Sequence, residues 1–470
     1  MSLAVSKAVD SSKVFIEQKS NVTARWDPHY HSPRFANLDR ELNLMDAVPL
    51  RKVSKSIFSG ITPLSGGDAY IEGTEGIAFI RSGDFNDDGT INEDSLIRLK
   101  PEVHEKLMRR SQLEANDVLF AIVGATIGKV GIFPGGYQAN INQAVSAVRL
   151  NKDVLPHFAH AFFLTRLGQE QIERIKRPVA RANINLDEVG TLRIPVFPAS
   201  KQRAVILALS EAFAKKITLE AKAIGLMQDI DDVLLEELGI CIDPEPPNKL
   251  ERRMFHLSFS DLTGTRFDPI AHQEKRQALE GAIHASKFPI YDLRKLVKIS
   301  KIRVKEIEED LTYVGLENID GKSGEYIAIS EKESVGTATQ FRPGQILFPK
   351  LRPYLNKTHL AGFNGVCSTE FHVFEPEGAT GEYLTAFLRS RAIVGITSLL
   401  MTGNTLPRLQ MSDIERLPIP VPSPDLQRDI CFEISKLRAK AIDHREQARA
   451  DLEKAKRDIE ALILGKEPVA

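Results

Sequence analysis

The feature that most constrains this sequence is a long segment that occurs twice. The first copy begins at Leu192-Arg193-Ile194-Pro195-Val196, reaches Gln202-Arg203 and continues without proline to Leu238-Gly239. The second begins at Leu417-Pro418-Ile419-Pro420-Val421, reaches Gln427-Arg428 and continues without proline to Leu464-Gly465. Six of the twelve positions from 192 to 203 are identical in the second copy. A repeat with this long period predicts one structural unit that is used twice.

The repeat extends upstream of these segments. Arg25-Trp26-Asp27-Pro28 with His31 is matched by Arg266-Phe267-Asp268-Pro269 with His272. Val118-Leu119-Phe120 with Lys129 is matched by Ile346-Leu347-Phe348 with Lys357. The offset between the copies shrinks along the chain, which indicates loop insertions in the first copy. We assign no functional role to the Arg-Trp/Phe-Asp-Pro motif from the sequence.

Length and composition indicate a globular chain of two or three domains. The chain has 470 residues, of which 42% are hydrophobic and 27% charged, as in ordinary globular proteins. The first twenty residues carry charges and no apolar core of a signal peptide. The most apolar run, 118–133, is too short to span a bilayer. Three widely spaced cysteines predict neither a disulfide framework nor a zinc site. We therefore expect a cytoplasmic protein.

The segments before each long run have the pattern of mixed α and β structure. Short apolar runs such as 118–123, 144–150, 346–348 and 371–374 are bounded by Gly, Pro or Asn, which is typical of strands. The segments 155–175 and 381–396 have the periodicity of surface helices. The predicted fold class is α+β, with two mixed α/β globules.

The two proline-free runs are predicted to be long helices. Apolar residues recur at alternating spacings of three and four, for example Ile430, Ile434 and Leu437 in the second run, and Ile206, Leu209, Phe213, Ile217 and Ile224 in the first. About 38 helical residues span about 57 Å at 1.5 Å per residue, too long to be buried inside either globule. Connectivity then predicts an antiparallel coiled-coil spacer between the globules, with an internal pseudo-twofold repeat and both termini near the first globule.

A catalytic centre is not indicated. Gly124 to Lys129 resembles a P-loop, but it has three residues between its glycines and Val130 where a hydroxyl should hold magnesium. His29 and His31 beside Asp27 suggest a metal site only weakly, because the second copy keeps one histidine. No nucleophile, metalloprotease or dinucleotide motif stands out. We expect a chain that is not an enzyme by itself and binds no metal or cofactor.

Nucleic-acid binding is better supported, although a net charge of −1 is unusual for a free-standing DNA binder. Cations and amides, the groups that contact phosphates and base edges, gather in segments that lack acidic residues. Clusters of this kind are also common on solvated faces. The candidate DNA-binding residues are Lys129, Asn142, Gln143, Arg149 and Arg181 in the first globule, and Lys350, Arg352, Tyr354, Lys357 and Arg408 in the second.

With these motifs in place, nearly the whole chain resembles the specificity subunit of type I restriction-modification systems. The resemblance rests on the two Leu-x-Ile-Pro-Val…Gln-Arg junctions and on the run from Leu347 to Tyr354. It implies target-recognition domains at 1–198 and 250–423, spacer helices at 199–239 and 424–465, a linker at 240–249 and a tail at 466–470. Each domain would read one half of a bipartite site in double-stranded DNA, and the helices would set the spacing.

The resemblance also implies partners. Two methyltransferase subunits would dock around the helices, and restriction subunits would join for cleavage. S-adenosylmethionine, ATP and magnesium are then expected on these partners only. Two alternatives remain open: a specificity subunit of another modification or defence system, such as a two-subunit type II enzyme or a phage-exclusion complex, and a coiled-coil scaffold that does not bind DNA.

Overall fold

The computed structural model divides the chain into two compact units. Unit 1 comprises Met1–Thr218 and Gln447–Ala470, and unit 2 comprises Leu219–Glu446. Among the described residues, no helix is long and apolar enough to cross a membrane. The structure describes residues 25–64, 68–71, 73, 75–86, 88–177, 182–243, 256, 258, 269–300, 302–304, 311–328, 337–403 and 406–466.

Unit 1 contains two four-stranded sheets. The first has the order β2-β9-β6-β7 and is antiparallel throughout, and the second has the order β3-β5-β4-β8 with β4 and β8 parallel. The strands of the first sheet are β2 (Ser54–Ser59), β9 (Val145–Leu150), β6 (Val118–Ala121) and β7 (Val130–Ile132). Those of the second are β3 (Tyr70–Ile71), β5 (Ile97–Leu99), β4 (Ile77–Ile80) and β8 (Ala139–Ile141).

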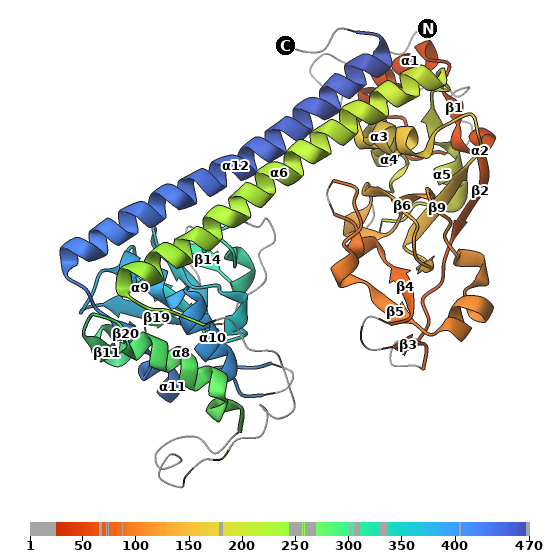
Figure 1. The fold of residues 1–470 in the computed structure, drawn as a ribbon. Helices are drawn as coiled ribbons and strands as arrows, with labels where there is room; N and C mark the ends of the chain where they lie inside the picture. Colours follow the sequence, from red (N-terminus) through yellow and green to blue (C-terminus); the bar gives the residue numbers. More distant parts are fainter. Residues whose placement is uncertain are drawn as a thin grey trace. The chain divides into compact units, whose positions relative to one another are not determined.

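Helices cover the first sheet of unit 1 (Figure 1). Phe120 of β6 packs edge-on against Phe163 of α3, with ring centroids 5.0 Å apart. A small antiparallel pair, β1 (Val48–Pro49) with β10 (Arg193–Ile194), joins the start of the unit to the beginning of the long helix. The helices are α1 (Ala36–Leu44), α2 (Leu50–Val53), α3 (Pro156–Leu164), α4 (Arg166–Ile175) and α5 (Leu186–Thr191).

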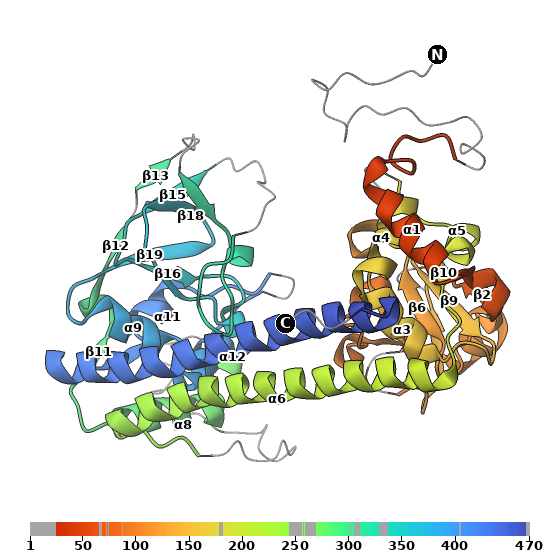
Figure 2. The same ribbon diagram turned by 90° about the horizontal axis from the view of Figure 1, so that it is seen from above.

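Unit 2 repeats the first sheet strand for strand. Its order is β12-β19-β16-β17, and in Figure 2 this sheet lies between α9 and the second sheet. The strands are β12 (Val297–Ser300), β19 (Phe371–Pro376), β16 (Ile346–Pro349) and β17 (His359–Leu360). The helices are α8 (Glu274–His284), α9 (Gly381–Leu388), α10 (Arg391–Leu399) and α11 (Met411–Glu415), and the small pair is β11 (Ile290–Asp292) with β20 (Pro418–Pro420).

The second sheet differs between the units. In unit 2 its order is β13-β15-β18-β14, from β13 (Arg303–Val304), β15 (Ala338–Phe341), β18 (Gly365–Ser368) and β14 (Thr312–Val314). Here β18 lies inside the sheet, whereas β8, which also forms the parallel pairing of its sheet, is an edge strand. The two units therefore share a common first sheet and helical layer, and they vary in the second sheet.

The mixed α/β fold predicted from the sequence is confirmed, with a correction to its shorter helices. The segments 155–175 and 381–396 each form two helices, divided at Thr165 and at Arg389-Ser390. Most side chains of α3 and α9 are buried. The apolar pattern was correct in period, but these helices pack inside the unit instead of on its surface.

The two long helices are also confirmed: α6 spans Ala199–Leu238 and α12 spans Pro424–Leu464. Gly239 and Gly465 follow them with φ of 69° and 68°, the left-handed conformation in which helices commonly end. Within unit 1, the Lys201 ammonium donates to the carbonyl of Ile463 at 3.0 Å, and Lys215 pairs with Asp451 at 2.7 Å. The halves of the two helices in this unit are therefore antiparallel.

The predicted apolar seam of α6 was wrong at two positions. Ile217 and Ile224 are 61% and 48% exposed, whereas Ala223 is fully buried. Alanine at position 223 allows close helix packing. A prediction from hydrophobicity instead selects Ile224, the larger residue one position later. The true buried line includes Val205, Leu209 and Ala223.

The repeated glutamines are internal clamps. Gln202, 2% exposed, accepts from the Leu155 amide at 2.7 Å and donates to the carbonyls of Asp153 and Phe197 at 2.9 and 2.7 Å. Gln427, also 2% exposed, accepts from the Thr380 amide at 2.9 Å and donates to the Pro422 carbonyl at 2.9 Å. In both units the clamp joins the first turn of the long helix to the loop that begins a buried helix.

We predict that Gln427→Ala lowers the free energy of unfolding by about 1–3 kcal/mol, because it leaves the partly buried amide of Thr380 and the buried carbonyl of Pro422 unpaired. Thermal denaturation followed by circular dichroism measures the effect. The control is Gln228→Ala on the exposed face of α6, which should leave the midpoint almost unchanged. Equal midpoints for both variants would contradict the role of the clamp.

Candidate nucleic-acid interface

Four cations from separate segments gather at one end of β16 in unit 2. Lys350 and Arg352 follow the strand, Arg408 comes from the segment 402–408, and Arg303 belongs to β13. Backbone contacts bring the segments together: Leu351 forms a bridge with Arg408, and the Arg352 amide donates to the Pro407 carbonyl at 3.0 Å. Sequence alone predicted three of the four; Arg303, which lies in a separate basic stretch with Lys301 and Lys305, was not among the candidates.

The charged groups of this cluster shift the pKa values of Lys350 and Glu370. Burial lowers the pKa of Lys350, and the positive charges of Arg303 and Arg408 lower it further, against the opposing effect of Glu370. The ammonium donates to the Thr369 carbonyl at 2.6 Å. Arg408 pairs with Glu370 at 2.6 Å and thereby lowers the pKa of that carboxyl group. One carboxylate thus faces several cations, and the cluster keeps a positive excess.

Arg352 and Tyr354 are both exposed in unit 2. Tyr354 is 46% exposed and belongs to a short helical turn, Pro353–Leu355. Arg352 is exposed, and its guanidinium makes no hydrogen bond or ion pair within the part of the chain that the structure describes. Both side chains are available to a ligand at this end of the sheet.

Lys357 and Lys129 have an internal role instead. The Lys357 ammonium donates to the carbonyls of Leu316 and Ile319 at 2.7 and 2.9 Å, and the Lys129 ammonium donates to the Phe85 carbonyl at 2.9 Å. In each unit the lysine reaches a short helical turn, Leu316–Asn318 or Ser82–Asp84, or the residue just after it. These equivalent lysines hold the second sheet of each unit to the first. Their contact with DNA stays a prediction.

The predicted residues of unit 1 are not brought together into one cluster. Asn142 and Gln143 lie before β9: Asn142 Oδ1 accepts from the Ala144 amide at 3.1 Å, and the exposed Gln143 accepts from the Thr62 hydroxyl. Arg149 lies near the other end of β9 and pairs with Asp117 and Glu114 at 2.8 and 2.6 Å. The Asp117 carboxylate raises the pKa of Arg149. Arg181 lies outside the described residues.

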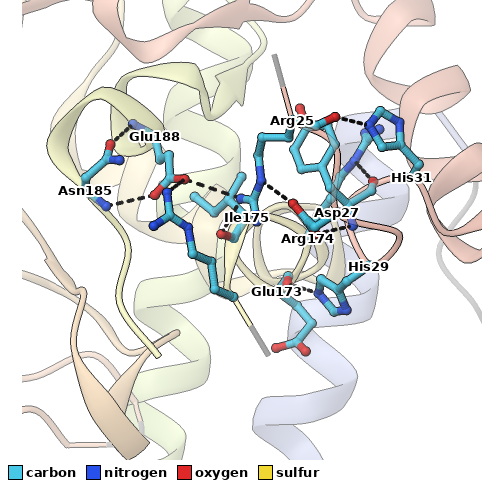
Figure 3. Close-up of polar contacts among 11 residues, drawn as sticks. Arg25, Asp27, His29, His31, Glu173, Arg174, Ile175, Asn185 and Glu188 are labelled. Carbon is cyan, nitrogen blue, oxygen red and sulfur yellow. Dashed lines mark hydrogen bonds and ion pairs between the residues drawn. The ribbon is translucent and has the colours of Figure 1, made fainter. Parts of the chain in front are cut away.

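The N-terminal motif, whose role the sequence left open, is a polar clamp (Figure 3). Arg25 donates to Asp27 at 2.7 Å and to the Ile175 carbonyl at the end of α4 at 2.7 Å, and it pairs with Glu188 of α5 at 3.4 Å. Asp27 accepts from the Tyr30 amide at 3.0 Å. Burial raises the pKa of the Asp27 carboxyl group, but the hydrogen bonds from Arg25 and the Tyr30 amide outweigh it and hold that pKa below its usual value.

The histidines of this motif complete the clamp. His29 Nε2 contacts the Glu173 carbonyl at 2.8 Å, and His31 Nε2 contacts the Arg25 carbonyl at 2.7 Å. Among the described residues no three metal-ligating side chains converge. Through Arg25, the clamp links the end of α4 to α5. In the second copy, Arg266-Phe267-Asp268 lies outside the described residues, and His272 is buried.

We predict that Lys357→Met lowers the thermal midpoint of the chain, because the Ile319 carbonyl loses the ammonium that donates to it and the Leu316 carbonyl keeps only the Ile319 amide, at a cost of about 1–3 kcal/mol. Differential scanning calorimetry provides the measurement. Lys322→Met, at an exposed position of the same unit, is the matched control and should leave the midpoint unchanged. A midpoint equal to that of the control would show that the lysine is not structural.

Comparisons with known proteins identify the class to which this arrangement is similar. Residues 67–225 match the family model described as "Type I restriction modification DNA specificity domain". The chain is 26% identical over 160 residues to the type I restriction enzyme EcoBI specificity subunit of Escherichia coli, covering 34% of this chain and 33% of that relative. It is 28% identical over 126 residues to the EcoDI specificity subunit of the same organism, covering 27% of this chain and 28% of that relative.

The matched stretch thus spans about a third of each curated relative. Two solved chains are similar over most of their length. One is from a type I R-M system, with 14% identity, a TM-score of 0.46 and coverage of 90% of this chain and 98% of that chain. The other is the S subunit of a type I restriction-modification system from M. genitalium, with 14% identity, a TM-score of 0.37 and coverage of 90% of this chain and 96% of that chain. The family resemblance inferred from the sequence is confirmed by the family model and by the curated relatives.

Proposed function

We propose that this chain, whose residues 67–225 form a type I restriction-modification DNA specificity domain, is the subunit that gives such a complex its DNA sequence specificity. The observation that carries the proposal is the sheet order β2-β9-β6-β7, of which β9, β6 and β7 lie in the matched segment, and its repetition in unit 2 as β12-β19-β16-β17. Two DNA-reading units on one chain would read a target in two halves. The domain boundaries predicted from the sequence remain part of this proposal.

In unit 2 the supporting feature is the cluster of Arg303, Lys350, Arg352 and Arg408. Phosphate contacts by Arg and Lys supply most of the affinity for DNA through the release of counterions. Three of the four side chains are exposed, and only Lys350 is partly buried. A positive group at one end of a sheet supports a surface for the DNA backbone, with base contacts from side chains that the backbone contacts position.

In unit 1 the candidate contacts are of another kind. The exposed Gln143 and the neighbouring Asn142 and Thr62 offer amide and hydroxyl groups, which suit base edges such as adenine. Arg149 is engaged by two carboxylates and is a weaker candidate for a phosphate. Because the two units present different side chains, we infer that the two half-sites differ in sequence.

The chain would act without chemistry of its own. Modification and cleavage would reside on methyltransferase and restriction subunits that carry S-adenosylmethionine, ATP and magnesium, in the cytoplasm where the cellular DNA lies.

We predict that the combined substitution of Arg303, Lys350 and Arg408 by alanine weakens the binding of the full chain to a random-sequence DNA duplex. The slope of log affinity against log salt should fall by up to about 2.7, since each lost phosphate contact contributes about 0.9. Fluorescence anisotropy at several salt concentrations measures the slope.

The matched control replaces Arg294, Arg342 and Lys436 by alanine. These are exposed cations of the same unit, and Arg342 precedes β16 whereas the cluster follows it. The control should keep the wild-type slope. If both triple variants keep it, or if the wild-type chain shows no salt-dependent binding, the DNA-reading function is rejected and the scaffold alternative is favoured.

A further inference from the structure

Each unit contains a turn that follows the parallel strand β4 or β14 of its second sheet. The turn runs from Phe85 to Ile91 in unit 1 and from Ile319 to Tyr326 in unit 2, and an antiparallel bridge between these end residues closes it. A short helical turn precedes both segments. In each unit the structural lysine described above donates to the carbonyl of the first residue at 2.9 Å. We call these two segments the anchor turns.

The second sheet of unit 1 has an apolar core that is separate from the core of the long helix. Phe85 and Ile91 of the anchor turn pack in the first of these cores, whereas Leu209 and Phe213 of α6 pack in the second. Strand β6 contributes to both, because successive side chains of a strand point to opposite faces of the sheet. Unit 2 has the same division. Apolar packing therefore joins the second sheet to the helix by way of the first sheet.

In unit 1 an ion pair joins the anchor turn to the helix directly. The Lys216 ammonium of α6 donates to the Asp88 carboxylate at 3.0 Å, and the two side chains are 19% and 12% exposed. Burial raises the pKa of Asp88, but hydrogen bonds from Thr90 and Lys216 outweigh it and hold that pKa below its usual value. Between the turn and the helix lies a pocket of about 310 Å³, lined in part by Ile91 and Phe213. The ion pair thus connects two segments that are partly separated by open space.

Unit 2 makes the same kind of connection from other helix positions. Two arginines of α12 face two carboxylates of the anchor turn, Arg445 with Asp320 at 3.7 Å and Arg438 with Glu325 at 3.8 Å. In both units the acid lies on the turn and the cation on the helix. Lys216, however, corresponds to Ala441 in the repeat. Because non-equivalent residues produce the same contact, the contact itself has a role that the repeat of the sequence does not explain.

We propose that Lys216 in unit 1, with Arg438 and Arg445 in unit 2, are positioning residues that fix each second sheet to its helix and thereby fix the gap between the half-sites; this inference rests on the proposed function. The second sheet leads to Gln143 in unit 1 and carries Arg303 in unit 2, both candidate DNA contacts. A helix can set a distance only between groups that do not move against it. A loosely supported sheet would read its half-site at more than one distance.

The test uses the full chain with its methyltransferase partner, and the methylated positions in genomic DNA are mapped by sequencing. Lys216→Glu places a second carboxylate against Asp88 and separates the turn from the helix. The variant should keep both half-site sequences. It should raise methylation at targets whose gap is one base pair longer or shorter by at least about tenfold, because facing like charges destabilise the fixed arrangement.

The double variant Lys216→Glu with Asp88→Lys is the matched control. It restores an ion pair with the charges exchanged, and it should return methylation to the wild-type gap. Lys222→Glu makes the same charge change at an exposed position of α6 and should leave the gap and both half-sites unchanged.

Three results would overturn the inference. The first is a wild-type gap in Lys216→Glu, and the second is a relaxed gap that the double variant does not restore. The third is methylation lost at every gap length, which would make the ion pair a part of the fold only. Altered half-site sequences would also overturn it, because the turn would then contact bases. Failure of the proposed function would differ, because the wild-type complex would then yield no methylated sequence at all.

Discussion

The core of each unit depends on apolar side chains that lie far away in the sequence. Unit 1 buries Leu452, Ile459 and Ile463 of α12 among residues from the first half of the chain. Unit 2 buries Leu234 and Leu238 of α6 in its own core. Each such side chain contributes about 1.5–3 kcal/mol when it is fully buried. Neither globule is therefore complete without a segment of both long helices, and a spacer of this kind is part of the fold as well as a connection.

The sequence predicted the elements whose periodicity was long and whose ends were marked. The bounds of α6 and α12 follow from proline, from the glycines after them and from an apolar stripe, and all three are local signals. The exposed Ile217 and Ile224 could not be predicted, because the buried line runs through Ala223, whose small side chain carries little hydrophobic signal. The division of 155–175 into α3 and α4 was also missed, since the apolar pattern continues across Thr165.

The candidate site was harder to predict than the fold. A basic residue in the sequence does not show whether its charge faces solvent or the protein's own carbonyls. Lys129 and Lys357 were selected for their charge, yet both donate to backbone carbonyls in or just after a short helical turn of the same unit. Arg303 was overlooked because it lies far before Lys350 in the sequence and in a different sheet from β16, and only the fold brings their charges close.

The central claim is that one chain carries two different DNA-reading units. Its most direct test is to map the methylated positions that appear in genomic DNA when this chain is expressed with its methyltransferase partner, compared with the partner alone. The account predicts a target in two specific halves of different sequence, separated by a gap of fixed length in which any base is accepted. A single uninterrupted target, two identical halves, or the same methylated positions with and without this chain would contradict it.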